Sequence, residues 1–202
     1  MITNTTRPSR GRALPAVLAL AAFTALAACG TDTDTDPGPG QAPDQDQAAA
    51  AGNGAPSPLA DWFSSEVIDT GDLPIHEFRE TVQPGDEVAF SGKVMGRMQV
   101  FIPGRAAFIV GDPDIITTCD LIPGDDCETP WDACCEDPAN IAAGIVTVQL
   151  VGEDGRVLPH DIRGVDGLVE LSEVSILGTV AAASGNGNLI IEAARIHVHP
   201  AE

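Results

Sequence analysis

Short apolar stretches with a period of two residues, separated by turn signals, constrain the fold of this chain more than any other feature. In residues 87–95, alternate positions are apolar or small and would share one face of a strand: Val88, Phe90, Gly92 and Val94. Comparable stretches predict further strands at residues 106–110, 145–151, 174–182 and 189–198, with 156–158 as a hairpin partner and 98–102 as a continuation or a new strand. The sequence therefore predicts an all-β domain of five or six strands with little helix.

Glycines inside these stretches favour a closed barrel over a flat sheet. Gly92 and Gly178 interrupt predicted strands, as expected at bulges or sharp bends. The sequence Val-Ala-Phe-Ser-Gly-Lys-Val at 88–94, with the late hairpin formed by 176–180 and 189–196, resembles OB-fold domains. The resemblance spans residues 82–199 and implies a small five- to six-stranded barrel. A β-sandwich is the alternative.

Little regular structure is expected before the first strand. Residues 59–67 are compatible with a short amphipathic helix, in which Trp62 and Phe63 would cap one end of the core. From His76 onward the pattern becomes β-like. We therefore take residues 59–202 as one folded domain.

A dense group of cysteines interrupts the strand pattern. Four of the five cysteines follow the spacing Cys-x7-Cys-x6-Cys-Cys, within an insertion at about residues 112–140: Cys119, Cys127, Cys134 and Cys135. Outside the cytoplasm such a group predicts structural disulfides. Adjacent cysteines bond to each other only through a strained ring, so Cys134 and Cys135 would each pair with Cys119 or Cys127. Zinc or iron bound by the thiolates, or redox chemistry of the adjacent pair, are the alternatives.

The first residues have the features of an export signal. Three arginines precede the apolar run 13–28, which ends in Leu-Ala-Ala-Cys at 26–29. This segment resembles a bacterial lipoprotein signal. The resemblance implies removal of residues 1–28, lipidation of Cys29 and anchoring to a membrane in the cell envelope. Gly30 rather than aspartate follows Cys29, which implies the outer membrane if the cell is Gram-negative. Residues 29–58 are rich in Asp, Pro, Gly and Ala and predict a disordered tether.

The charge of the chain argues against nucleic acid as a partner. The sequence has 10 basic and 30 acidic residues, and three of the basic residues lie in the signal segment. Cleavage would leave seven basic against thirty acidic residues, a net charge of about −23. Such a surface repels phosphate backbones. The eight aromatic residues, none of them tyrosine, are also few for stacking on single strands.

The histidines offer a weaker candidate site. His197 and His199 would lie on one face of the last strand together with Arg195, and two such imidazoles can bind a metal. We expect this pair simply to be exposed, with metal binding as the alternative. His76 beside Glu77, and His160 beside Asp161, predict isolated surface pairs.

No catalytic motif is present. The chain lacks Gly-x-Ser-x-Gly, a phosphate-binding loop and His-Glu-x-x-His. We therefore expect a non-enzymatic, membrane-anchored lipoprotein without a cofactor, which presents a disulfide-stapled β-barrel to a ligand or an envelope protein partner. A metal-binding or redox protein that uses the cysteines is the first alternative, and an unrecognised hydrolase is the second.

Overall fold

The computed structural model describes residues 57–71, 73–185 and 187–201. The predicted signal peptide, the lipidation site Cys29 and residues 29–56 of the predicted tether lie outside the described residues. None of the helices in the described ranges is both long enough and apolar enough to cross a membrane.

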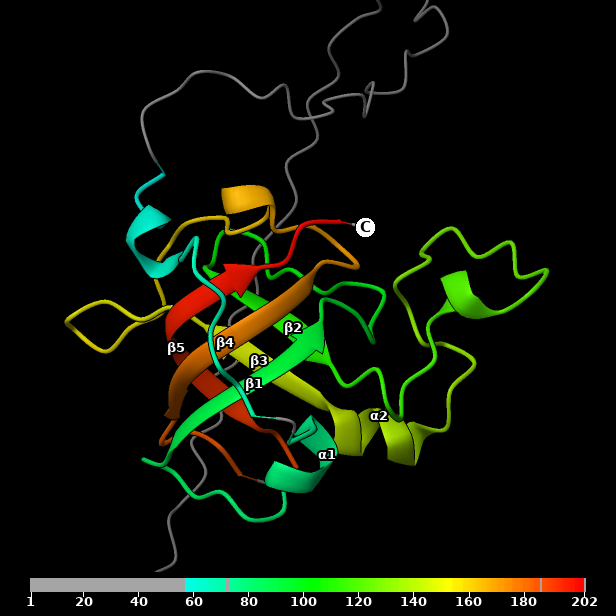
Figure 1. Cartoon of the computed structure of the whole chain (residues 1–202), viewed down its shortest axis with the longest axis horizontal. Helices are drawn as coiled ribbons and strands as arrows, with labels where there is room; N and C mark the ends of the chain where they lie inside the picture. Colours follow the sequence, from blue (N-terminus) through cyan, green and yellow to red (C-terminus); the bar gives the residue numbers. More distant parts are fainter. Residues whose placement is uncertain (1–56, 72, 186, 202) are drawn as a thin grey trace, which may run out of the picture. The chain divides into compact units, whose positions relative to one another are not determined.

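Five strands form a closed barrel in the order β1-β2-β3-β5-β4 (Figure 1). Their bounds are β1 Glu87–Lys93, β2 Ala107–Gly111, β3 Ile145–Gln149, β4 Glu173–Val180 and β5 Ile190–Val198. Strands β3 and β5 pair in parallel, and all other neighbours are antiparallel. The predicted small all-β barrel is confirmed, and the sheet closes on itself instead of splitting into a sandwich.

The core of the barrel comes from the apolar face of each strand. In β1, Phe90 is fully buried while its neighbour Ser91 is exposed, as the period of two predicts. The rings of Phe78 and Phe90 pack with centroids 5.2 Å apart. Residues 98–102 add only an isolated bridge between Phe101 and Phe108, and residues 156–158 add only a bridge from Val157 to Val151. The described part of the chain therefore has five strands, the lower of the two predicted numbers.

Gly178 marks the irregularity that the sequence suggested. The register of β4 against β5 shifts between Leu177 and Gly178. A Cβ atom at Gly178 would lie 2.6 Å from the carbonyl oxygen of Glu192 and 2.7 Å from Cγ2 of Ile191. Only glycine fits at this crossing, because backbone from the neighbouring strand fills the space of a side chain.

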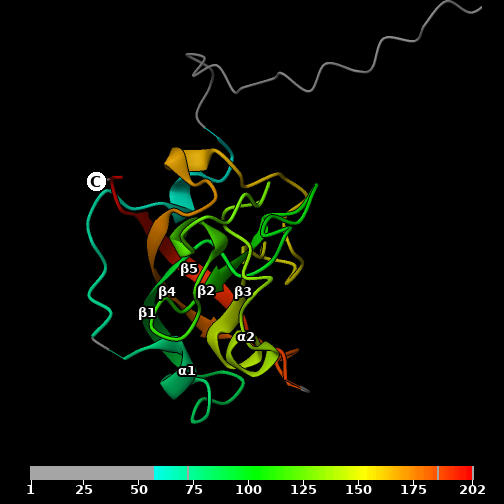
Figure 2. The same ribbon diagram turned by 90° about the vertical axis from the view of Figure 1, so that its right-hand side faces the viewer.

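The segment before β1 differs from its prediction. The helix expected at 59–67 is only a single 3-10 turn, η1 Ala60–Trp62, and the β-like pattern expected from His76 is the helix α1, Ile75–Phe78. Tertiary packing outweighs the local pattern here, because Ile75 and Phe78 are buried in the barrel core. Helix α1 contacts β1 and β3 at one end of the barrel (Figures 1 and 2). Trp62 and Phe63 pack against the core, as predicted.

The cysteines lie in a long excursion between β2 and β3. The loop extends away from the barrel, and a second helix, α2 Pro138–Gly144, leads directly into β3 (Figure 1). Asp137 caps this helix by accepting a hydrogen bond from the Ala139 amide at 2.8 Å, and Pro138 occupies its first turn. The sequence had not predicted α2, which has only seven residues.

Candidate metal-binding site

The neck of the cysteine loop is held by hydrogen bonds. Near its start, the amide of Cys119 donates to the carbonyl oxygen of Asp132 at 2.9 Å. The carboxylate of Glu136 accepts from the amides of Thr117 and Asp137, both at 2.9 Å. These backbone hydrogen bonds lower the pKa of Glu136 to about 2. The two ends of the loop are therefore joined without any crosslink.

A small apolar cluster fixes the base of the same loop. Met95, Ile116 and Ala133 are buried against one another, and Ile141 of α2 packs on them. A Cβ atom at Gly144 would come within 2.9 Å of Ile116 Cδ1, so the helix packs closely on this cluster. The loop base is thus continuous with α2 and belongs to the rigid part of the domain.

Trp131 attaches the loop to the barrel. Its indole Nε1 donates a hydrogen bond to the carbonyl oxygen of Met98 at 2.9 Å, and its own carbonyl oxygen accepts from the amide of Gly96 at 2.9 Å. Gly96 has a φ of 105°, a conformation that favours glycine. These contacts set the position of residues 131–135 relative to β1.

Three cysteine sulfurs converge inside the loop. The Sγ atoms of Cys119, Cys127 and Cys134 all lie within 4.8 Å of one another. Cys119 is buried, Cys127 is half-buried and Cys134 is exposed, so the cluster extends from the interior of the loop to its surface. Cys135 is not part of this set, although its Sγ lies 3.8 Å from that of Cys134.

These separations fit a shared metal ion better than a disulfide. None of the four cysteines in the described part of the chain is bonded to another. The Sγ atoms of Cys119 and Cys134 are 3.5 Å apart, whereas a disulfide bond is about 2.05 Å long. Two thiolates, each about 2.3 Å from a tetrahedral zinc ion, lie about 3.8 Å apart. Since all three separations are within 4.8 Å, no pair needs to contract by more than about 1 Å to reach such a geometry.

The three thiols differ in acidity. Burial raises the pKa of Cys119 to about 12. Hydrogen bonding with Thr129 lowers the pKa of Cys127. The hydrogen bond with Cys119 lowers the pKa of Cys134, but contact with Cys135 and desolvation raise it by more. The pKa of Cys134 therefore lies above its ordinary value. Without a cation the cluster therefore keeps protons on Cys119 and Cys134 at neutral pH.

The surroundings of the cluster favour a cation. Residues 119–135 carry five carboxylates and no lysine or arginine: Asp120, Asp125, Asp126, Glu128 and Asp132. Asp125 also orders the loop, because its side chain accepts a hydrogen bond from the amide of Cys127 at 3.0 Å. Thiolates formed here would add to an existing negative potential, which a bound cation offsets.

The histidines do not join the sulfurs. His197 and His199 share a face, as predicted, with ring centroids 4.8 Å apart, but neither belongs to the set of converging metal ligands. His197 is 7% exposed, so the expected exposure is wrong for it. Its Nδ1 donates to the carbonyl oxygen of Ser64 at 2.8 Å, and its Nε2 is a buried polar atom without a partner among the described residues.

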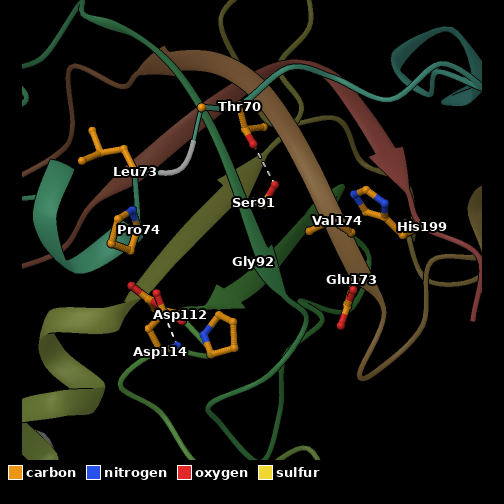
Figure 3. Close-up of a pocket in the computed structure, with 12 residues that line it drawn as sticks. Thr70, Leu73, Pro74, Ser91, Gly92, Asp112, Asp114, Glu173, Val174 and His199 are labelled. Carbon is orange, nitrogen blue, oxygen red and sulfur yellow. Dashed lines mark hydrogen bonds between the residues drawn. The ribbon is translucent and has the colours of Figure 1, made fainter. Parts of the chain in front are cut away.

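A cavity of about 440 Å³ lies beside this pair, between β1, β4 and the segment before α1 (Figure 3). A chain of hydrogen-bonded hydroxyl groups runs along its polar side. Ser91 Oγ lies 2.9 Å from Thr70 Oγ1 and 3.1 Å from Ser175 Oγ. The Ser175 hydroxyl in turn lies 2.7 Å from His199 Nε2. The Ser175 hydroxyl is thus satisfied on both sides, as in a structural network.

On the other side of the cavity, His76 pairs with a partner that the sequence did not reveal. Its Nδ1 lies 2.8 Å from Oδ2 of Asp112, and the same oxygen also accepts a hydrogen bond from the backbone amide of His76. The hydrogen bond of the ring raises the pKa of His76. Asp112 follows β2 and is 36 residues away. The predicted neighbour Glu77 also approaches the ring, with its Oε1 4.0 Å from Nε2 of His76, but Asp112 is the closer partner. At His160 the neighbouring Asp161 instead accepts from the amide of Gly104 at 2.6 Å.

The chain was compared with protein-family models, curated proteins and solved structures. No family model matches the chain. No curated protein and no solved structure matches it either.

Proposed function

We propose that this protein is an extracytoplasmic, membrane-anchored β-barrel that binds one thiophilic metal ion, zinc being the best fit, through Cys119, Cys127 and Cys134. The observation that carries the proposal is the convergence of three unbonded sulfur atoms within 4.8 Å. The charge of the loop supports a cation at this place, as argued above. Iron in a thiolate site or cluster uses four cysteines, whereas only three converge here, so zinc fits better.

The polypeptide around the cluster suits a metal site. Thr129 contacts Cys127 through its hydroxyl at 3.4 Å and would orient that ligand. Glu136 and Trp131 hold the chain on either side of Cys134 and Cys135 by hydrogen bonds that need no metal. The metal would therefore bind a largely formed loop and stabilise the domain by mass action.

The location of the protein rests on the N-terminal resemblance. Cys29 within Leu-Ala-Ala-Cys would carry the lipid, and residues 29–58 would act as a tether from the envelope membrane. Incorporation of labelled palmitate into the wild-type protein, and its loss in Cys29→Ser, is the expected result. A wild-type protein found wholly in the soluble fraction would contradict the anchor.

A disulfide-stapled module that binds a protein partner is the second candidate. The approach of Cys119 and Cys134 to 3.5 Å favours it, because a small rotation of either side chain would allow a bond. An oxidising compartment would favour the same outcome.

One measurement separates the two functions. The full chain carrying Cys29→Ser, which leaves only the four loop thiols, is purified with and without reductant and its intact mass is recorded under native conditions. The metal site predicts one zinc per chain, with three thiols that become alkylatable only after chelation and a Cys135 thiol that is alkylatable without it. Cys119→Ser should abolish the adduct, and His199→Asn, as the matched control, should retain it. Two disulfides and no metal would overturn the proposal in favour of the stapled module.

A further inference from the structure

We infer that the proposed metal ion has three protein ligands and one open coordination position, which accepts a neutral donor from outside the protein, such as an imidazole or water. This inference rests on the proposed function. Metal sites with four protein ligands are closed and structural, whereas sites with three keep a position for exchange or chemistry. Whether Cys135 is a ligand therefore decides what the site can do.

Cys135 is excluded from the cluster by its place in the chain. Its Sγ is 3.8 Å from Cys134 Sγ but does not share the 4.8 Å set with Cys119 and Cys127. The next residue, Glu136, is fixed through its side chain to Thr117 and through its amide to the carbonyl oxygen of Ala133, at 3.0 Å. These hydrogen bonds fix the backbone beside Cys135, and with its present side-chain orientation the Cys135 sulfur lies outside the set.

The open position faces solvent. Cys119 lies at the back of the cluster with 3% of its surface exposed, whereas Cys134 is exposed and Cys127 is half-buried. Three sulfurs arranged in this way occupy the inner side of a metal ion. The remaining position lies on the outer side of the loop, where an external ligand can reach it without a change in the barrel.

Charge selects the kind of ligand. A divalent ion with three thiolates has a net charge of −1, and five carboxylates lie in the same 17-residue loop. An anionic fourth ligand would add a further negative charge to this potential. A neutral nitrogen donor avoids that repulsion, and the discrimination between the two should weaken as salt screens the carboxylates.

Cobalt(II) provides the test, because its absorption reports both thiolate number and coordination geometry. The full chain carrying Cys29→Ser is loaded with cobalt, and each remaining cysteine is replaced by serine in turn. With three thiolate ligands, Cys119→Ser, Cys127→Ser and Cys134→Ser should each remove about a third or more of the thiolate-to-cobalt charge-transfer absorption. Cys135→Ser, the matched control one residue away, should leave it unchanged.

Imidazole and azide are then added separately to the cobalt-loaded protein. Imidazole should shift the visible bands at lower concentration than azide. The difference between the concentrations of imidazole and azide needed for the shift should become smaller as salt is raised from about 0.01 M to about 1 M, because the Debye length falls from about 30 Å to about 3 Å.

The possible failures are distinct. If Cys135→Ser removes about a quarter of the charge-transfer absorption and imidazole has no effect, the site is a closed four-thiolate site. That result overturns the inference and leaves the proposed metal binding intact. If azide binds as well as imidazole at low salt, the argument for a neutral ligand is wrong. If neither zinc nor cobalt binds to the reduced protein, the proposed function fails as well.

Discussion

Replacing Gly178 by alanine tests whether the barrel closes as described. The new Cβ atom would lie 2.6 Å from the carbonyl oxygen of Glu192 and 3.1 Å from Cα of Ala193. Both are backbone atoms of β5, so relief requires the β4–β5 pair to separate. Overpacking of this kind costs about 1–3 kcal/mol. The loss of glycine's freedom in the unfolded chain returns about 0.4–1 kcal/mol. Taking the middle of each range, we expect a net destabilisation of about 1.3 kcal/mol.

Gly152 provides the matched control. It has no positive φ, and its Cβ atom would meet only side-chain ends closely, Asp154 Oδ1 at 3.2 Å and Leu158 Cδ2 at 3.3 Å. Gly152→Ala should therefore change the stability by less than about 1 kcal/mol. Urea unfolding of the full chain carrying Cys29→Ser, followed by the fluorescence of Trp62 and Trp131, compares the two variants. A Gly178→Ala protein as stable as the wild type would refute the close crossing of β4 and β5.

Three further predictions concern the ends of the barrel and the loop. The hydrogen bond with Asp112 raises the pKa of His76, so this pair stabilises the fold below about pH 6.5, and its contribution is lost as the pH rises through the folded-state pKa. Asp112→Asn should therefore flatten the pH dependence of the urea unfolding midpoint between about pH 6 and about pH 8. An unchanged pH dependence in this variant would contradict the pairing. Ile116→Ala should lower the free energy of unfolding by about 2–5 kcal/mol, because Ile116 is only 2% exposed in the loop base. The matched control Ile116→Val should lower it by about 0.5–1.5 kcal/mol. If the alanine variant loses no more than the valine variant, the cluster does not hold the loop. Glu136→Gln should accelerate amide hydrogen exchange at Thr117 and Asp137 while the amides of β4 keep their protection, and equal protection in variant and wild type would show that the carboxylate does not close the neck.

The strands could be predicted because their burial follows local sequence. Phe90 is followed by the polar Ser91 and Val94 is preceded by Lys93, and the turn residues around 185–188 mark the last hairpin, so each strand is visible within its own segment. The bulge at Gly178 was also predictable, because a glycine inside an apolar strand usually marks a bulge or a close approach of neighbouring backbone.

The helices and the charged pair were not predictable for a physical reason. Helix α1 has only four residues, and its stability comes from burying Ile75 and Phe78 in a core that other segments build. Asp112 reaches His76 across 36 residues of chain, a proximity that only the closed barrel creates. The predicted neighbour Glu77 is the more distant partner, with its Oε1 4.0 Å from Nε2 of His76.

The cysteine group illustrates a different limit. Its spacing identified the residues that matter, but spacing alone cannot distinguish sulfurs that bond from sulfurs that share an ion. The predicted compartment favoured disulfides, whereas the three-dimensional separation of Cys119, Cys127 and Cys134 fits the proposed metal site. The separate position of Cys135 depends on the Glu136 contacts, which no local pattern encodes.

The way in which the cysteine loop joins the barrel has a consequence for how such a protein can change. Gly111 and Ile145 are paired residues of β2 and β3, so the chain leaves and re-enters the sheet at the same rung. The part of the intervening segment beyond the neck formed by Thr117 and Glu136 can be lengthened or shortened at a small entropic cost, because closure entropy grows only slowly with loop length. Barrel and loop can therefore diverge at separate rates, with mutations in the loop altering its side chains while the strands continue to specify the same sheet.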